Sequence, residues 1–116
     1  MTAVLGIALF LASADAAHPS WMVGTWGRQN KGEQHVDCGS DHDTTYHRDG
    51  RYTFLDTSGT WRIEGDRLIE TMTDPGGSEI PANVGKSSII QFKRISRDVL
   101  EVTGEYPGRL IKCPGH

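Results

Sequence analysis

The stretch Thr60–Glu70, TWRIEGDRLIE, decides the fold class. Trp61 and Ile63 alternate with polar residues, which is typical of a β-strand with one buried face. Gly65-Asp66 then supplies the Gly-first dipeptide of a two-residue type II′ turn, and a second strand-like run follows. These residues therefore predict an antiparallel β-hairpin.

The same pattern extends to both sides of this hairpin. Short runs rich in β-branched and aromatic residues alternate with turn signals at a spacing of about 8–12 residues. Asp49-Gly50 predicts a type I′ hairpin turn, and further reversals are expected at Thr57-Ser58-Gly59, Ser96-Arg97-Asp98 and Tyr106-Pro107-Gly108. About eight strands are predicted, at residues 21–28, 44–48, 51–55, 60–64, 67–73, 87–95, 99–104 and 108–113. Two longer connections, 29–43 and 74–86, separate some of them.

Tight turns between successive strands predict an antiparallel up-and-down meander. Closing the meander into a small barrel removes both sheet edges and buries one face of every strand. Alternation predicts an interior of Trp26, Tyr52, Phe54, Trp61, Ile63, Leu68, Ile90, Phe92, Leu100, Val102 and Leu110. With so many large side chains inside, we expect the barrel to be largely packed, with little free volume.

Composition supports a single domain and excludes several classes of protein. The chain has 116 residues, a formal net charge of −3, a hydrophobic content of 36% and a pI near 5.9. This length fits one domain. The acidic balance argues against a nucleic-acid partner, and the composition is not that of a coiled coil or a membrane bundle.

The first residues are typical of a signal peptide. Met1–Leu11 is an uncharged apolar run, too short to span a bilayer comfortably, and Ala14-Asp15-Ala16 fits a small-x-small cleavage site. One departure is that the first basic residue is Arg28. We therefore predict a signal peptide at residues 1–16 and a mature domain at 17–116, exported to the periplasm or secreted, without a membrane span. The alternative is a buried N-terminal helix.

Export gives the two cysteines, Cys38 and Cys113, a structural meaning. An oxidising compartment favours a disulfide between them. The bond would close a loop of roughly 75 residues and contribute up to about 4 kcal/mol in the chain-entropy model. The alternative for Cys38 is a metal thiolate within His35-Val36-Asp37-Cys38.

Gly24-Thr25-Trp26, at the start of the meander, resembles the Gly-x-Trp motif of the lipocalin and calycin group. That resemblance implies a barrel in which Gly24 permits close approach and Trp26 closes one end beneath a basic side chain. The candidates for this cation–π partner are Arg109 and Lys112. Residues 49–52 and 59–63 are similar to segments of small exported lipocalin-like bacterial proteins, although the mature chain is shorter than a full lipocalin.

We predict that the protein acts by binding rather than by catalysis. The first hypothesis is a non-enzymatic module that holds a small apolar ligand or lipid at the open end opposite Trp26. Its predicted ligand-binding residues are Tyr52, Phe54, Trp61 and Phe92. No cofactor is expected.

The alternative is a protein-binding barrel. Small exported barrels of this kind include inhibitors of lysozyme-type enzymes, which plug a partner's cleft with a rim loop. Here that loop would be 74–86 or 31–43, since long loops at barrel rims often carry binding.

A third, weaker hypothesis is a metal-dependent enzyme. His35, His42 and His47 fall in or next to an aspartate-rich segment, and imidazole with carboxylate suits divalent metals. Their spacing matches no recognised zinc pattern, and no Gly-x-Ser-x-Gly signature of a nucleophile occurs. We therefore predict that the protein is not an enzyme.

Overall fold

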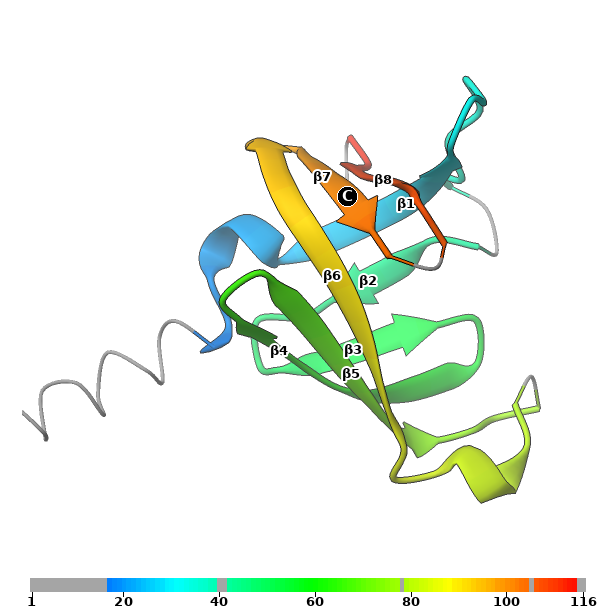
Figure 1. The fold of residues 1–116 in the computed structure, drawn as a ribbon. Coiled ribbons are helices and arrows are strands. Elements are labelled where there is room, and N and C mark those ends of the chain that lie inside the picture. The colour runs from blue at the N-terminus through cyan, green and yellow to red at the C-terminus, as the bar shows by residue number, and fades with distance from the viewer. Residues whose placement is uncertain (1–16, 40–41, 78, 105, 115–116) are drawn as a thin grey trace, which may run out of the picture.

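Eight antiparallel strands in sequence order close into one barrel, with β8 paired to β1 (Figure 1). The computed structural model describes residues 17–39, 42–77, 79–104 and 106–114. Its strands are β1 (Gly24–Asn30), β2 (Thr44–Tyr46), β3 (Arg51–Phe54), β4 (Thr57–Glu64), β5 (Arg67–Asp74), β6 (Ser87–Ser96), β7 (Val99–Thr103) and β8 (Gly108–Lys112), with short 3-10 helices η1 (Ser20–Met22) and η2 (Pro81–Asn83). The all-β meander barrel is therefore confirmed.

The predicted signal peptide, residues 1–16, lies outside the described residues. The helices formed by the described residues are all too short to cross a membrane.

The strand directions define two ends of the barrel. The closed end carries η1 and the turns at 47–50, 65–66 and 97–98, whereas the open end carries the connections 31–43, 55–56, 75–86 and 104–107. In Figure 1 the 75–86 connection, which contains η2, lies below the barrel. These four open-end connections include the two longest in the described chain.

The β4–β5 hairpin forms as predicted. Glu64 pairs with Arg67, which leaves Gly65-Asp66 as the loop, and Gly65 has the positive φ (+62°) of the first position in a type II′ turn.

The β2–β3 turn differs from the predicted type I′ turn. The N–H of His47 donates to the Arg51 carbonyl (2.8 Å), and the N–H of Gly50 donates to the His47 carbonyl (3.1 Å). Gly50 has a positive φ (+91°), whereas Asp49 does not. The loop therefore contains one more residue than predicted and ends on a left-handed glycine, the second common hairpin class.

The predicted reversal at Thr57-Ser58-Gly59 is wrong, because these residues belong to β4. The turn is Leu55-Asp56, since Phe54 pairs with Thr57. Gly59 instead sits at a β-bulge, where an added Cβ would lie 2.0 Å from the Thr71 carbonyl oxygen. This glycine serves close approach of two strands rather than a turn.

The predicted first strand also begins too early. Trp21 and Met22 belong to η1, in which the N–H of Met22 donates to the Pro19 carbonyl (3.0 Å). Met22 is fully buried beneath the barrel. The polypeptide therefore crosses the closed end before it enters β1 at Gly24.

The core contains every side chain that alternation assigned to the interior. Trp26, Tyr52, Trp61, Ile63, Leu68, Phe92, Leu100, Val102 and Leu110 are buried, and Phe54 and Ile90 pack against them partly buried. Met22 and Tyr46 belong to the same core but were not predicted. Trp61, Leu68 and Leu100, all buried to within 2% exposure, fill the closed end.

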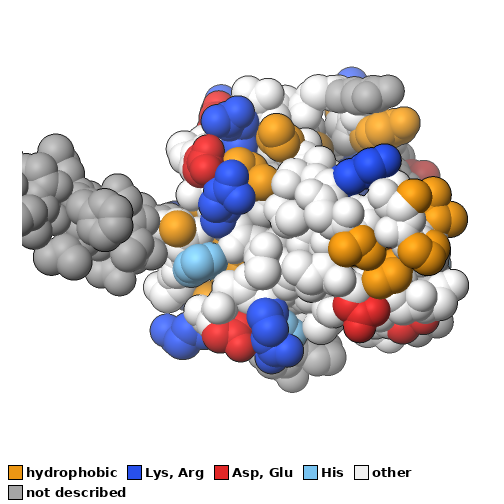
Figure 2. Space-filling model, turned by 90° about the horizontal axis from the view of Figure 1, so that it is seen from below, with side chains coloured by type: hydrophobic (Ala, Val, Ile, Leu, Met, Phe, Trp, Pro, Cys, Tyr) orange, Lys and Arg blue, Asp and Glu red, His pale blue; other side chains and the backbone are white. Residues whose placement is uncertain are grey.

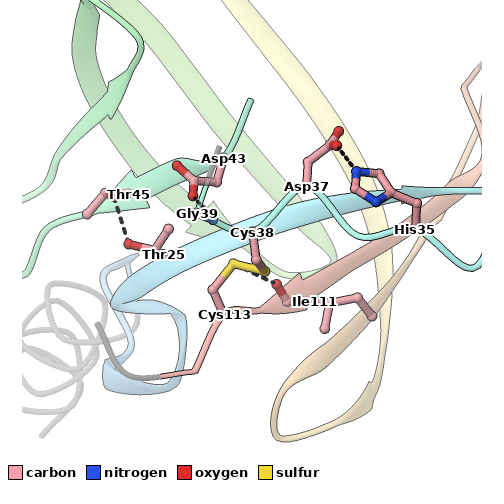
Figure 3. Close-up of a disulfide and its surroundings, with 9 residues drawn as sticks. All are labelled: Thr25, His35, Asp37, Cys38, Gly39, Asp43, Thr45, Ile111 and Cys113. Carbon is pink, nitrogen blue, oxygen red and sulfur yellow. Dashed lines mark hydrogen bonds and ion pairs between the residues drawn. A yellow bond between two sulfur atoms is a disulfide. The ribbon is translucent and has the colours of Figure 1, made fainter. Parts of the chain in front are cut away.

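The predicted disulfide joins Cys38 to Cys113 (Figure 3). Cys113 follows β8, and its N–H donates to the Thr25 carbonyl of β1 (2.8 Å). Cys38 lies over Gly27, where an added Cβ would be 2.5 Å from the Asp37 carbonyl oxygen. The absence of a side chain at Gly27 thus lets the 31–43 connection lie against β1, and the disulfide fastens it there.

Candidate functional site

A cavity of about 610 Å³ occupies the open end of the barrel. It is lined by Trp26, Arg28, Asn30, Asp37, His42, Thr44, Tyr46, Tyr52, Phe54, Thr57, Glu70, Met72, Glu79, Asn83, Lys86, Ser87, Ser88, Ile90 and Leu110. The interior of the closed end is filled by the large side chains of Trp61, Leu68 and Leu100. Near the open end, some of the residues that line the cavity have short side chains: Thr44, Thr57 and Ser88. The prediction of little free volume is therefore wrong for this half of the barrel.

Aromatic and aliphatic side chains form one part of the cavity wall. Trp26 lies at the floor, where its indole N–H donates to the Met22 carbonyl (2.9 Å) and fixes the ring. Phe54, Met72 and Ile90 line the cavity from β3, β5 and β6. Such a wall suits an apolar ligand surface.

Glu70 of β5 brings a carboxylate to this wall. In register it lies between Trp61 of β4 and Ser88 of β6. Its carboxylate accepts a hydrogen bond from the hydroxyl of Tyr46. Among the described residues Glu70 has no ion-pair partner. The side chain is therefore an acid held inside the barrel by a single hydrogen bond.

Burial controls the titration of this group of side chains. Desolvation raises the pKa of Glu70, and the hydrogen bond from Tyr46 only partly opposes that rise. Desolvation, followed by the adjacent Glu70 carboxylate, raises the pKa of Tyr46 well above its usual value. The pKa of Tyr52 is raised for the same two reasons. Both phenols consequently stay protonated at neutral pH and present hydroxyl groups near Glu70.

Tyr52 has a hydroxyl that is not used within the described part of the fold. It lines the cavity, and no described residue forms a hydrogen bond with its oxygen. A ligand polar group that enters the cavity can therefore pair with this hydroxyl.

The mouth of the cavity has charges of both signs. The Arg28 guanidinium is held by Asn30 (3.0 Å) and by the carbonyls of Tyr106 and Pro107. Asp37 pairs with His35 (2.9 Å) at the mouth. Most of these polar groups already have partners in the protein.

Glu79 lies on the opposite connection and accepts a hydrogen bond from Asn83 (3.0 Å). Lys86, from the same connection, also lines the cavity.

Two of the four predicted ligand-binding residues line the cavity. Tyr52 and Phe54 do so. Trp61 and Phe92 lie instead in the packed closed end, where the Trp61 indole donates to the His47 carbonyl (2.9 Å) and Phe92 packs against Trp21 (6.1 Å between ring centroids). All four face inward, but alternation specifies a face and not a height along the barrel.

Sequence reasoning missed Glu70 and Tyr46. The alternation pattern did indicate Glu70, because it is two residues from Leu68 and so shares the inward face of the strand. In the same way Tyr46 shares the inward face of its strand with Thr44, which also lines the cavity. A glutamate at a position that faces the barrel interior indicates that the interior contains a cavity.

A basic side chain lies over the Trp26 ring, as the resemblance implies. Lys112, rather than Arg109, provides the cation over Trp26, with its Nζ 5.9 Å from the ring centroid. Lys112 pairs directly with Trp26 across β1 and β8, whereas Arg109 is exposed opposite Gln29. At Gly24 an added Cβ would lie 2.8 Å from Lys112 Cε, so this glycine admits the lysine.

The three histidines of the metal hypothesis do not meet. His35 pairs with Asp37, His42 lines the cavity, and His47 contacts Thr53 (3.4 Å). Within the described ranges, which leave out residues 40–41, no group of three or more His, Cys, Asp or Glu side chains is arranged to hold a metal.

The sheet is a closed antiparallel meander of the kind that the lipocalin resemblance implies. Comparison with known proteins adds no family: no family model, no curated protein and no solved structure matches this chain.

Proposed function

We propose that this protein is an exported, non-enzymatic binding module of lipocalin-like type, which holds a small, largely apolar molecule in its open-end cavity. The cavity itself is the observation that carries the proposal. Its volume of about 610 Å³ lies within the range of ligand pockets, roughly 300–1,000 Å³. Its lining also brings aromatic and aliphatic side chains together with polar and charged ones, so that one site offers contacts for both an apolar body and a polar group.

Native mass spectrometry of the protein purified from its own host tests this function. We expect a chain that begins at Ala17, lacks two hydrogens because of the disulfide, and carries the added mass of a bound molecule. A bare protein under gentle conditions, from several growth conditions, would contradict the proposal.

A matched pair of variants locates the ligand. Ile90 lines the cavity, whereas its neighbour Ile89 is 57% exposed on the outside of β6. Ile90→Trp fills the cavity and should remove the added mass, while Ile89→Trp should retain it. Equal occupancy in both variants would place the bound molecule elsewhere.

A rim-loop inhibitor of another protein is the second candidate. The observation that favours it is the exposure of Ile80 (62%) and Val84 on the 75–86 connection. Leu55, in the adjacent open-end turn, is also exposed. Figure 2, viewed from the side of this connection, shows hydrophobic side chains gathered along one part of the surface.

Affinity capture tests the second candidate function, inhibition of another protein through the rim loop. A partner retained by the wild-type protein and lost from Ile80→Ser/Val84→Ser would support inhibition through the rim. The matched control is Ile95→Ser, at the other end of β6 and 48% exposed. A partner retained equally by all three proteins would rule out this loop.

A further inference from the structure

We infer that the ligand is an organic cation, an apolar body bearing an ammonium group, and that the ammonium group binds against Glu70. This inference rests on the proposed ligand-binding function and specifies the chemical class of the ligand. It begins from the carboxylate at the cavity wall, which none of the functions considered from sequence uses.

The first argument is the unbalanced charge of Glu70. Burying a carboxylate is costly unless it is paired and hydrogen-bonded, and Tyr46 supplies one hydrogen bond. Among the described residues no Lys, Arg or His forms an ion pair with this side chain. A ligand cation would supply the missing charge, and hydrogen bonds to charged groups are about twice as strong as neutral ones.

The second argument is the aromatic surface around the carboxylate. Trp26, Tyr46, Tyr52 and Phe54 line the same cavity as Glu70. The face of an aromatic ring attracts a cation, and the attraction is stronger where the cation is desolvated. Rings and carboxylate together therefore favour a positively charged group over a neutral one.

Other ligand classes fit this wall less well. An anion at this depth would face the Glu70 carboxylate. The cations Arg28 and Lys86 lie at the mouth of the cavity, and Nε and Nη2 of Arg28 already donate to Asn30 and to backbone carbonyls. A wholly apolar ligand would remove water from Glu70 without replacing its hydrogen bonds. An alcohol can donate a hydrogen bond to the Glu70 carboxylate but does not balance its negative charge.

Three probes with one octyl chain and different head groups test the inference. Octylamine, octan-1-ol and octanoate are titrated calorimetrically into the full chain at about pH 8. At this pH the amine of octylamine and the carboxylate of octanoate are both charged. We expect octylamine to bind about 10- to 100-fold more tightly than octan-1-ol, as a charge-assisted hydrogen bond predicts, and octanoate to bind most weakly.

The decisive variant is Glu70→Gln, which keeps the size and a hydrogen-bond acceptor but removes the charge. It should reduce octylamine affinity to that of octan-1-ol and leave octan-1-ol unchanged. Glu79→Gln is the matched control, because Glu79 lines the cavity at its mouth. It should preserve the preference for the amine.

A pH titration of the wild-type protein gives an independent readout. Octylamine affinity should fall as Glu70 becomes protonated at lower pH, whereas octan-1-ol affinity should stay constant. The titratable groups nearest Glu70 are Tyr46 of β2 and Tyr52 of β3, and both phenols have raised pKa values. Asp37, His42, Glu79 and Lys86 also line the cavity, so the same titration of Glu70→Gln isolates the contribution of Glu70. The facing residues of β4 and β6, Trp61 and Ser88, do not titrate in this range.

The outcomes separate the inference from the function on which it rests. Amine and alcohol binding with equal affinity, or a preference retained in Glu70→Gln, would overturn the cation site and leave a ligand-binding cavity. A preference lost in Glu79→Gln would move the cation to the mouth and also overturn it. Failure of all three probes to bind would overturn the cavity function together with the inference.

Discussion

The two ends of this barrel are built from the same strands and are opposite in character. On β5, Leu68, Glu70 and Met72 share the inward face, yet Leu68 is fully buried whereas Glu70 and Met72 border a cavity. The closed end is packed with large side chains beneath η1. The open end carries short inward residues and an acid.

This difference shows how a small barrel can be both stable and hollow. Packing at the closed end contributes strongly to the hydrophobic stabilisation, because Leu68 and Leu100 are fully buried there. The open end need not contribute as much, so a charged residue is tolerated there. The packed core and the cavity are therefore formed by different levels of the same strands.

Breaking the disulfide should have the largest effect on stability. The bond fastens the 31–43 connection of the open end to the segment after β8, beside the closed end. In Cys38→Ser/Cys113→Ser the free energy of unfolding should fall by up to about 4 kcal/mol, because the unfolded chain gains the entropy of a long open loop. Urea unfolding measures the loss, with reductant added to the wild-type protein as the matched comparison. A loss below about 1 kcal/mol would mean that residual structure in the unfolded chain already restrains this loop.

A pair of substitutions on β5 compares the two ends directly. Leu68→Ala should lower the free energy of unfolding by about 3 kcal/mol, because it leaves a void in a packed core. Met72→Ala should cost about 1 kcal/mol or less, because this half-buried side chain already borders a cavity. Chemical denaturation of both variants provides the measurement. Similar losses at the two positions would show that the open end is packed like the closed end.

The sequence specifies most of the fold because alternation and turn chemistry are local signals. Trp61, Ile63 and Gly65-Asp66 form the hairpin as predicted. The errors arose where one residue type serves two purposes. Gly59 was interpreted as a turn residue but relieves a close strand contact, and Leu55 instead adopts the left-handed conformation, with φ +54°.

The cavity was less predictable than the fold. Alternation places Tyr52, Phe54, Trp61 and Phe92 inside, but their height along the barrel depends on strand register, which no local pattern encodes. Two of them consequently line the cavity and two do not. The disulfide was predictable because the chain has two cysteines, which leave a single pairing.

The smallest expected effect is the pH dependence that Glu70 adds to stability. Because burial raises its pKa above the usual value of 4.5, the folded protein binds this proton more tightly than the unfolded chain. The stability associated with the proton is complete below the unfolded pKa and is lost as pH rises through the folded pKa. Glu70→Gln should therefore be slightly more stable than the wild-type protein at neutral pH, and the difference should shrink as pH falls towards 4.5.

Thermal unfolding of the two proteins across this pH range measures the difference, with Glu79→Gln as the control at the exposed mouth. The control should differ little from the wild-type protein in stability, because an exposed charge contributes little. A Glu70→Gln curve parallel to that of the wild-type protein would mean that water already solvates the carboxylate. The open end would then differ from the closed end only in packing, and the electrostatic reason for a cationic ligand would disappear with it.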